Sequence, residues 1–229
     1  MANSNAPQLL NEDGTASMAT ALMTSHHGFR RDVAHFGRAL RRIVAGDVSR
    51  AAAVREEWTR FRETLHGHHR AEDQGLFPSV RAQHPELEPV IDGLDADHRR
   101  IDPLLEAGDE SFAALPESAG AALALIDELR ALLDAHLAVE EARVVPFLRD
   151  AKTFPPPATD AELAMYADGF AWSTHGIAPQ VLAEIDRIIP AALVARLPAA
   201  RAAFAERCVR VWGSAQAGAS LTPVPDWIG

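Results

Sequence analysis

The sequence predicts an all-α protein, and three observations support this fold class. Alanine, leucine, arginine and glutamate dominate at helical spacing, no alternating apolar and polar run of useful length occurs, and aromatic residues make up only 6% of the chain. The 229 residues suffice for a full buried core, as one large domain or as one domain with a substantial appendage. We therefore expect a helical core with further helices attached to it.

Four long helices joined by short reversals are expected in the first two thirds of the chain. Their approximate ranges are 16–45, 48–83, 85–108 and 116–150. Gly46-Asp47 is typical of a tight antiparallel reversal, and a kink or break is expected at Pro78. Such an arrangement predicts an antiparallel up-down-up-down four-helix bundle. We assign the bundle to residues 16–152 and a flexible N-terminal arm to residues 1–15.

Residues 153–229 are expected to form a C-terminal helical extension. A proline run at 155–157 gives a stiff stop, and three further helices are predicted at about 159–172, 179–189 and 191–212. The segment is too apolar to be a linker. We expect it to pack on the bundle, or to form an interface with a protein partner or with a second copy of the chain.

Charge and cysteine content exclude several function classes. The 22 Lys and Arg residues against 32 Asp and Glu residues give a net charge of −10, which repels nucleic acids and anionic lipid surfaces. Cys208 is the single cysteine, so neither an intramolecular disulfide nor a cysteine-based zinc site is possible. The polar start lacks the apolar core of a signal peptide, and no apolar stretch reaches about 18 residues. We expect a cytoplasmic protein that binds small molecules, metal cations or other proteins.

An internal repeat carries the chemistry. A lone histidine is followed on the next helix by His-x-x-x-Glu, and then after six residues by proline. The two copies consist of His26, His68 and Glu72, and of His98, His136 and Glu140. Residues i and i+4 point the same way from adjacent helical turns, so each His-x-x-x-Glu presents an imidazole and a carboxylate to one side. A duplicated helical hairpin therefore brings four imidazoles and two carboxylates into the bundle interior.

The composition of this group predicts a metal centre. Two carboxylates buried together without a cation would have to protonate or find partners, and a pair of metal ions removes that problem. Mixed imidazole and carboxylate ligands suit iron or manganese, with zinc possible, and do not suit calcium or magnesium. If each glutamate bridges two metals, open positions remain for water, an oxo bridge or a small gas.

His27 and His69 stand beside two of these residues and are the alternatives to them. We choose His26 because the apolar residue three positions later parallels the one that follows His98, and His68 because only it stands four residues before its glutamate. His69 remains open as an alternate ligand or as a group that supports the ligands.

The acids that follow the two glutamates, Asp73 and Glu141, allow two interpretations. They orient ligand imidazoles through hydrogen bonds, or they are solvated and paired with arginines. Glu63 and His66 form the Glu-x-x-His pair of ferritin-like di-iron proteins. No second such pair occurs, so a ferritin-like site is disfavoured.

The six residues of the repeat resemble the haemerythrin-like family, specifically its HHE cation-binding domain, over about residues 16–150. The resemblance implies a four-helix bundle with two iron ions, oxo- or hydroxo-bridged, held by those six residues, with the two glutamates as bridges. Manganese and zinc are the alternative metals. Oxygen-carrying haemerythrins use a second histidine on the third helix and an aspartate on the fourth. Here Leu94 stands four residues before His98, and the fourth helix offers Glu140.

The resemblance leaves three functions open. In the first, an open iron position binds a small diatomic ligand, dioxygen or nitric oxide, for sensing, storage or detoxification. In the second, the centre is an enzyme that acts on nitric oxide or hydrogen peroxide. In the third, the protein senses iron or redox state and acts through protein partners.

Overall fold

The computed structural model describes residues 9–214, and within this range the secondary structure is helical, without a strand. The predicted all-α class is confirmed. The chain divides into two compact units, residues 32–144 in one and residues 1–31 with 145–229 in the other, so the division falls inside the first helix. Across residues 9–214, no helix combines the length and apolar character needed to cross a membrane.

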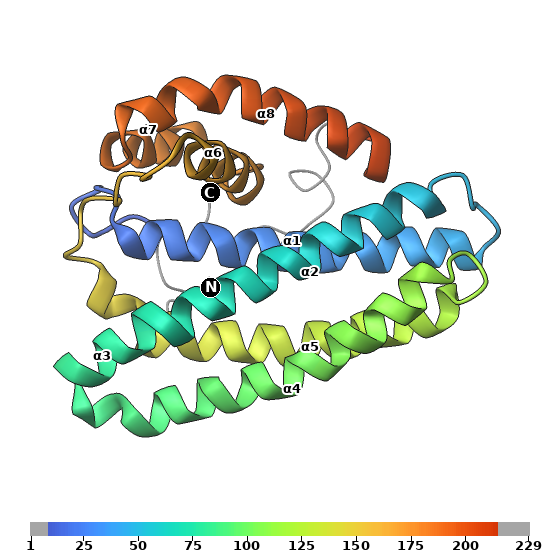
Figure 1. Cartoon of the computed structure of the whole chain (residues 1–229), viewed down its shortest axis with the longest axis horizontal. Helices are drawn as coiled ribbons and strands as arrows, with labels where there is room; N and C mark the ends of the chain where they lie inside the picture. The colour runs from blue at the N-terminus through green and yellow to red at the C-terminus, as the bar shows by residue number, and fades with distance from the viewer. Residues whose placement is uncertain (1–8, 215–229) are drawn as a thin grey trace, which may run out of the picture. The chain divides into compact units, whose positions relative to one another are not determined.

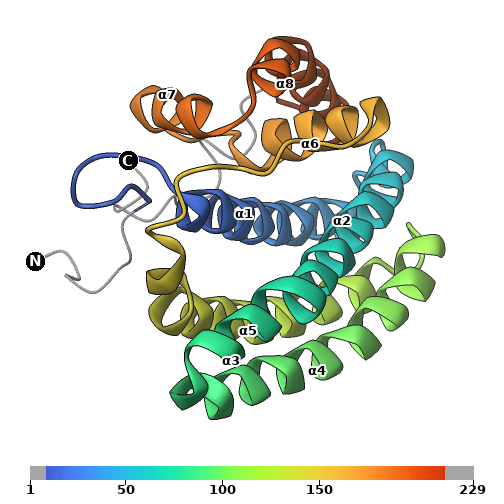
Figure 2. The same ribbon diagram turned by 60° about the vertical axis from the view of Figure 1, so that its left-hand side comes forward.

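The unit of residues 32–144 contains the second part of α1 and the segments up to α5. Its elements are α1 (Met18–Val44), α2 (Ala51–Ala71), a π-helical turn η1 (Glu72–Leu76), α3 (Phe77–Gln83), a 3-10 turn η2 (Pro85–Leu87), α4 (Glu88–Ala113) and α5 (Ala119–Arg143). Figures 1 and 2 show α2 running on into α3, and α4 and α5 lying side by side.

An aromatic cluster joins three helices of this unit. The ring of Phe36 on α1 lies 5.8 Å from Trp58 and 5.5 Å from Phe61, both on α2, and 5.4 Å from Phe112 on α4. Trp58 stacks on Phe112 at 4.3 Å. All four side chains are buried, and aromatic side chains bury about 150–250 Å² each, so this cluster dominates the core at its end of the unit.

Helix α4 runs through Gly108, where the sequence predicted its end, and continues to Ala113. The reason is a close contact: a Cβ atom at position 108 would lie 2.1 Å from the indole of Trp58. Glycine is therefore required here for the approach of α2 to α4, and it does not end the helix.

The predicted break at Pro78 occurs one turn earlier, as a π-helical turn over residues 72–76. The N–H of Phe77 donates to the carbonyl of Glu72, five residues back, which is the hydrogen bond of a π-helix. Pro78 then occupies the first turn of α3, where its missing N–H costs little. In the second copy of the repeat the chain behaves differently, because α5 ends at Arg143 and a 3-10 turn, η3 (Val145–Leu148), follows.

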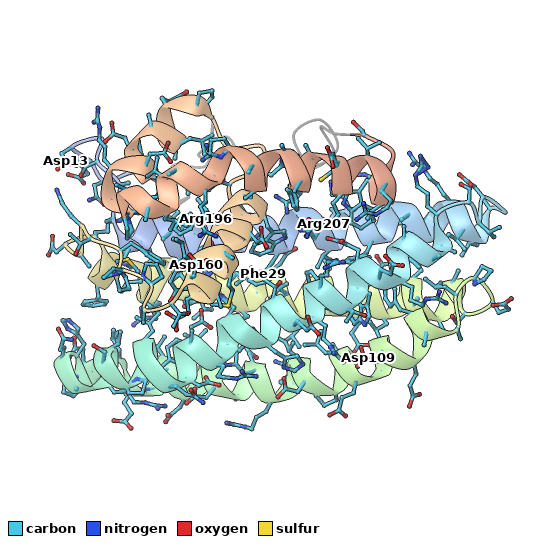
Figure 3. All side chains as sticks on the ribbon, turned by 45° about the horizontal axis from the view of Figure 1, so that its top comes forward. Asp13, Phe29, Asp109, Asp160, Arg196 and Arg207 are labelled. Atoms are coloured by element: carbon cyan, nitrogen blue, oxygen red, sulfur yellow. The ribbon has the colours of Figure 1, made fainter. Side chains whose placement is uncertain are left out.

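The other unit contains the first part of α1, residues 18–31, and three later helices. These are α6 (Asp160–Ser173), α7 (Pro179–Ile188) and α8 (Ala191–Trp212), each within one residue of its predicted ends. Helices α6 and α8 pack against each other, and Arg196 of α8 donates to Asp160 of α6 at 2.5 Å (Figure 3). The predicted packing of this extension on the bundle stays a prediction.

Residues 9–15 are held in this unit, which differs from the predicted flexible arm at 1–15. Leu9 is buried, and the side-chain amide of Asn11 donates to the carbonyl of Arg149 at 3.0 Å. Asp13 accepts a hydrogen bond from Lys152 at 3.0 Å. The polar composition of the segment predicts a flexible arm and gives no sign of these contacts. Residues 1–8 and the predicted tail from 215 lie outside the described residues.

Candidate metal centre

A cluster of buried histidines and acids lies where α2, η1, α4 and α5 meet. Four residues each offer one ligand atom, and these atoms lie within 4.8 Å of one another. They are His69, Glu72, His98 and His136. All four are at most 5% exposed. Three of them belong to the predicted ligand set, and the fourth, His69, is the alternative that the sequence left open.

The carboxylate of Glu72 also belongs to a second group, with His68 and Glu140, whose ligand atoms again lie within 4.8 Å of one another. Its Oε1 lies 2.9 Å from Nε2 of His68, as the i, i+4 spacing requires. Its Oε2 lies 3.5 Å from Nε2 of His98. One buried carboxylate therefore has an imidazole beside each of its oxygens.

The three imidazoles of the first group pack closely. The ring centroid of His98 lies 3.9 Å from that of His69 and 4.8 Å from that of His136. Burial, together with the neighbouring imidazoles of His98 and His68, lowers the pKa of His69 to about 2. His69 is therefore neutral at physiological pH and has a lone pair to offer.

The chemistry of His69 fits a bound cation. Both of its ring nitrogens are buried, and neither has a hydrogen-bond partner among the described residues. Leaving a buried polar atom without a partner costs about 1–3 kcal/mol, and coordination to a metal ion relieves that cost. Mixed imidazole and carboxylate donors suit iron, manganese or zinc.

Asp73 fixes the orientation of His98. Nδ1 of His98 donates to the Asp73 carboxylate at 2.9 Å, which leaves Nε2 directed toward Glu72. Burial alone would lower the pKa of His98, but the hydrogen bond and charge of Glu72, together with those of Asp73, outweigh burial and raise the pKa. The structure supports the first interpretation of Asp73, because its carboxylate accepts a hydrogen bond from an imidazole.

Comparison with protein-family models supports a cation site in this region. The model described as "Hemerythrin HHE cation binding domain" matches residues 17–148, more than half of the chain. The chain belongs to the haemerythrin HHE cation-binding family. The matched segment of the HHE domain includes all six residues of the repeat, and it ends before α6. Searches of curated proteins and of solved structures found no match.

The preference for His68 rests on the i, i+4 spacing alone, and it leaves His69 open as an alternative. His69 and Glu72 are separated by three residues, and residues three apart share a helix face as well as residues four apart do. The His-His-x-x-Glu run therefore already contained the signal for both histidines. Glu141 is buried, at 5% exposure, so the solvated interpretation does not apply to it.

His26 lies in the first part of α1, which belongs to the other unit, and it is fully buried. Its place among the ligands of the HHE domain stays a prediction from the sequence repeat. His66 has a half-exposed ring 3.7 Å from the carboxylate of Asp102. This exposed pair has no place in either ligand group.

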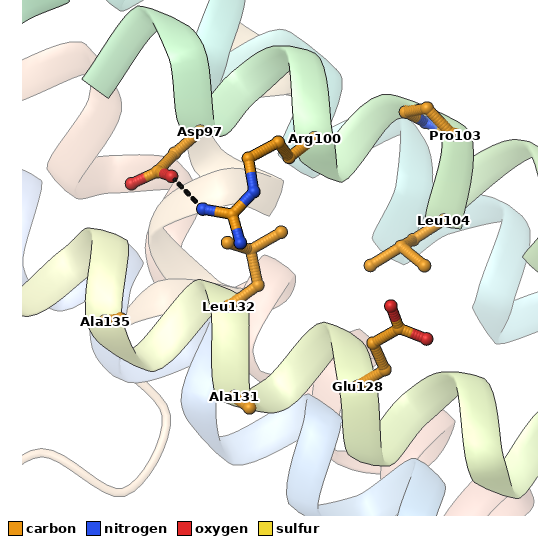
Figure 4. Close-up of a pocket in the computed structure, with 8 residues that line it drawn as sticks. All are labelled: Asp97, Arg100, Pro103, Leu104, Glu128, Ala131, Leu132 and Ala135. Carbon is orange, nitrogen blue, oxygen red and sulfur yellow. Dashed lines mark hydrogen bonds and ion pairs between the residues drawn. The ribbon is translucent and has the colours of Figure 1, made fainter. Parts of the chain in front are cut away.

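A groove between α4 and α5 lies beside the cluster of the HHE domain and has a volume of about 540 Å³. Its lining residues, drawn in Figure 4, are Asp97, Arg100, Pro103, Leu104, Glu128, Ala131, Leu132 and Ala135. Asp97 accepts a hydrogen bond from Arg100 at 2.8 Å, and its other oxygen lies 3.9 Å from Nδ1 of His136. Asp97 therefore lies between the groove and the cluster of candidate metal ligands.

Proposed function

We propose that this HHE protein holds two iron ions in an antiparallel four-helix bundle and binds a small diatomic ligand, dioxygen or nitric oxide, for sensing, storage or detoxification. The observation that carries the proposal is the Glu72 carboxylate, which has His68 beside one oxygen and His98 beside the other. A buried carboxylate flanked in this way suits two cations that share it.

The two groups of ligand atoms support two metal positions. His69, His98 and His136 would hold one iron, and His68 and Glu140 would hold the other, with Glu72 shared. The sequence repeat adds His26 to the second set. When bound, iron supplies a redox-active centre with an open coordination position for the diatomic ligand.

The chain's own residues prepare this position. Phe77 stacks near His98 at a ring separation of 5.7 Å, and Leu94 and Ile101 are buried on the same helix as His98. These apolar side chains exclude water from the imidazoles. Asp73 holds the proton on Nδ1 of His98, so Nε2 is the nitrogen that would bind a metal ion.

Metal analysis of the untagged protein tests the proposal. Inductively coupled plasma mass spectrometry should find about two irons per chain, and charge-transfer absorption in air should bleach on anaerobic reduction. His136→Ala should lose iron, whereas His66→Ala should keep it. Manganese or zinc in place of iron would correct the metal, and no stoichiometric metal after attempted reconstitution would overturn the proposal.

A second measurement separates ligand binding from turnover. Addition of nitric oxide to the reduced protein should give a stable adduct, without consumption of further nitric oxide. Multiple turnovers of nitric oxide or hydrogen peroxide that vanish in Glu72→Ala and Glu140→Ala would instead identify an enzyme.

A further inference from the structure

Arg31 of α1 lies at the C-terminal end of α6, within one compact unit. Its Nη1 donates to the carbonyl oxygen of Trp172 at 2.8 Å and to that of His175 at 3.2 Å. The side chain is only 1% exposed. Carbonyl groups at the end of a helix lack helical partners and carry partial negative charge, so a buried guanidinium stabilises them. Arg31 therefore caps α6 from a neighbouring helix.

Two aromatic rings enclose the same guanidinium. Cζ of Arg31 lies 5.8 Å from the ring centroid of Trp172 and 5.3 Å from that of Phe204 on α8. Phe29 of α1 meets the Trp172 indole edge to face at 5.0 Å. Because guanidinium groups stack on aromatic faces, one arginine links α1 to both α6 and α8.

His27 and Gly28 add two further contacts at this place. Nε2 of His27 lies 2.9 Å from the carbonyl oxygen of His175, the same oxygen that the guanidinium reaches. A Cβ atom on Gly28 would lie 2.7 Å from the Trp172 indole, so the backbone of α1 touches this ring directly. Substitution of Gly28 by any larger residue would displace the indole.

These contacts directly follow His26 in the sequence. Successive helical residues are rotated by about 100°, so fixing positions 27, 28 and 31 fixes the rotation of α1 about its axis and with it the direction of the His26 side chain. We infer that Arg31 is a positioning residue for the metal ligand His26 and that α6 and α8 hold this segment of α1. The inference rests on the proposed function, because it assigns His26 to iron.

The role assigned to the C-terminal helices is therefore metal retention. The family match ends at residue 148 and does not reach α6, so this role belongs to residues outside the HHE domain. If this segment of α1 separated from α6, the His26 side chain would also lose its fixed direction. Iron should accordingly be released faster from a protein in which the Arg31 contacts are removed.

Arg31→Met tests this coupling, because methionine keeps an apolar stem and lacks the guanidinium. Release of iron to a chelator should become about tenfold faster or more, because removal of groups that orient metal ligands typically costs about 10–100-fold in metal affinity. In the metal-free variant, the amide hydrogens of α6 should exchange faster by mass spectrometry. Arg42→Met, at an exposed position of the same helix, is the matched control and should change neither quantity. Faster α6 exchange with unchanged iron release would overturn the inference.

If Arg31→Met fails to fold, Gly28→Ala tests the same coupling at a different contact between α1 and α6. The added methyl group must displace the Trp172 indole, and iron release should again accelerate. Gly169→Ala, on α6 with no atom within 4 Å of the new Cβ, is its control and should release iron at the rate of the unaltered protein. Equal rates for Gly28→Ala and the unaltered protein would overturn the inference.

The two possible failures are distinguishable. An unaltered protein without iron overturns the proposed function and this inference together. An unaltered protein with two irons, from which Arg31→Met and Gly28→Ala release iron at the normal rate, overturns the inference alone. His26→Ala should release iron at least as fast as Arg31→Met, and a normal rate in that variant also overturns the inference.

Discussion

The imidazole of His69 lies flat against that of His98, with ring centroids 3.9 Å apart and ring planes 13° apart. Two rings at this distance repel each other strongly if both are protonated. Their pKa values are shifted in opposite directions: burial lowers that of His69 to about 2, whereas for His98 the effect of burial is outweighed by Glu72 and Asp73. The pair thus combines a neutral ring with a ring held by two carboxylates.

His69→Leu should separate metal binding from stability. Leucine removes two buried nitrogens that have no hydrogen-bond partner within residues 9–214, so the metal-free variant should be about 1–2 kcal/mol more stable than the metal-free parent in urea denaturation. The same variant should lose bound metal. His66→Leu, at a half-exposed ring, should keep its metal and change stability by less than about 0.5 kcal/mol. Full metal content in His69→Leu would contradict its assignment as a ligand.

The stability advantage of His69→Leu should grow as the pH falls. An unfolded histidine binds a proton below about pH 6.5, whereas folded His69 has a pKa of about 2 and does not. Between these values the unfolded chain binds more protons, so the folded parent loses up to about 1.4 kcal/mol per pH unit on acidification. Urea denaturation of both metal-free proteins at about pH 7.5 and pH 5.5 should show the difference rise by about 1 kcal/mol. A difference independent of pH would refute this linkage.

His98→Gln should show the opposite pH trend. The folded pKa of His98 is raised, so its contribution to stability is present below the unfolded pKa and is lost as the pH rises through the folded value. The loss of stability caused by His98→Gln in the metal-free protein should therefore be larger at low pH than at high pH. The same two urea titrations measure it, and a loss that increases with pH would show that the carboxylates do not hold His98.

Asp73→Asn should weaken metal binding without removing a ligand. The substitution replaces the carboxylate that accepts from Nδ1 of His98, and loss of such a group typically costs 10–100-fold in metal affinity, as a rough range. Competition with a chelator measures the affinity, and NMR titration of the metal-free protein should show a lower pKa for His98. Asp102→Asn removes the acid of an exposed histidine pair and is the matched control. Equal affinities in the two variants would exclude a positioning role for Asp73.

Gly108→Ala should destabilise the protein by about 1–3 kcal/mol, because the new methyl group overlaps the Trp58 indole. Gly120→Ala on α5 places its methyl group in open space, and there alanine should stabilise the helix by up to about 1 kcal/mol. Urea denaturation of the two variants should therefore give changes of opposite sign. A neutral Gly108→Ala would mean that α2 and α4 separate without cost.

The helical class and the family were predictable because their signals are local and repeated. Residues four apart share a helix face, so the two His-x-x-x-Glu runs pointed to His68, His136 and Glu140, whose ligand atoms lie in the same groups as those of Glu72. The prediction of α8 at 191–212 agrees with the structure at both ends, since proline precedes it and glycine follows it.

The remaining features depend on contacts that the sequence does not encode locally. A glycine that ends a helix and a glycine that admits an indole look the same in the sequence, so the sequence alone predicts a helix end at Gly108. The irregularity expected at Pro78 lies one turn before the proline, as a π-helical turn. The helix then continues beyond Pro78 as α3. The preference for His68 over His69 rests on the i, i+4 spacing to Glu72, whereas the i, i+3 spacing also applies and includes His69.

Glu140 is fully buried and lies in the last turn of α5, which ends at Arg143. The aligned peptide dipoles give the C-terminal end of a helix a partial negative charge, so this carboxylate is repelled by its own helix. Glu72 lies within the continuous run from α2 to α3 and does not experience this repulsion. The two halves of the duplication are therefore electrostatically unequal. A cation held beside Glu140 would therefore meet more negative charge than one held by His69, His98 and His136.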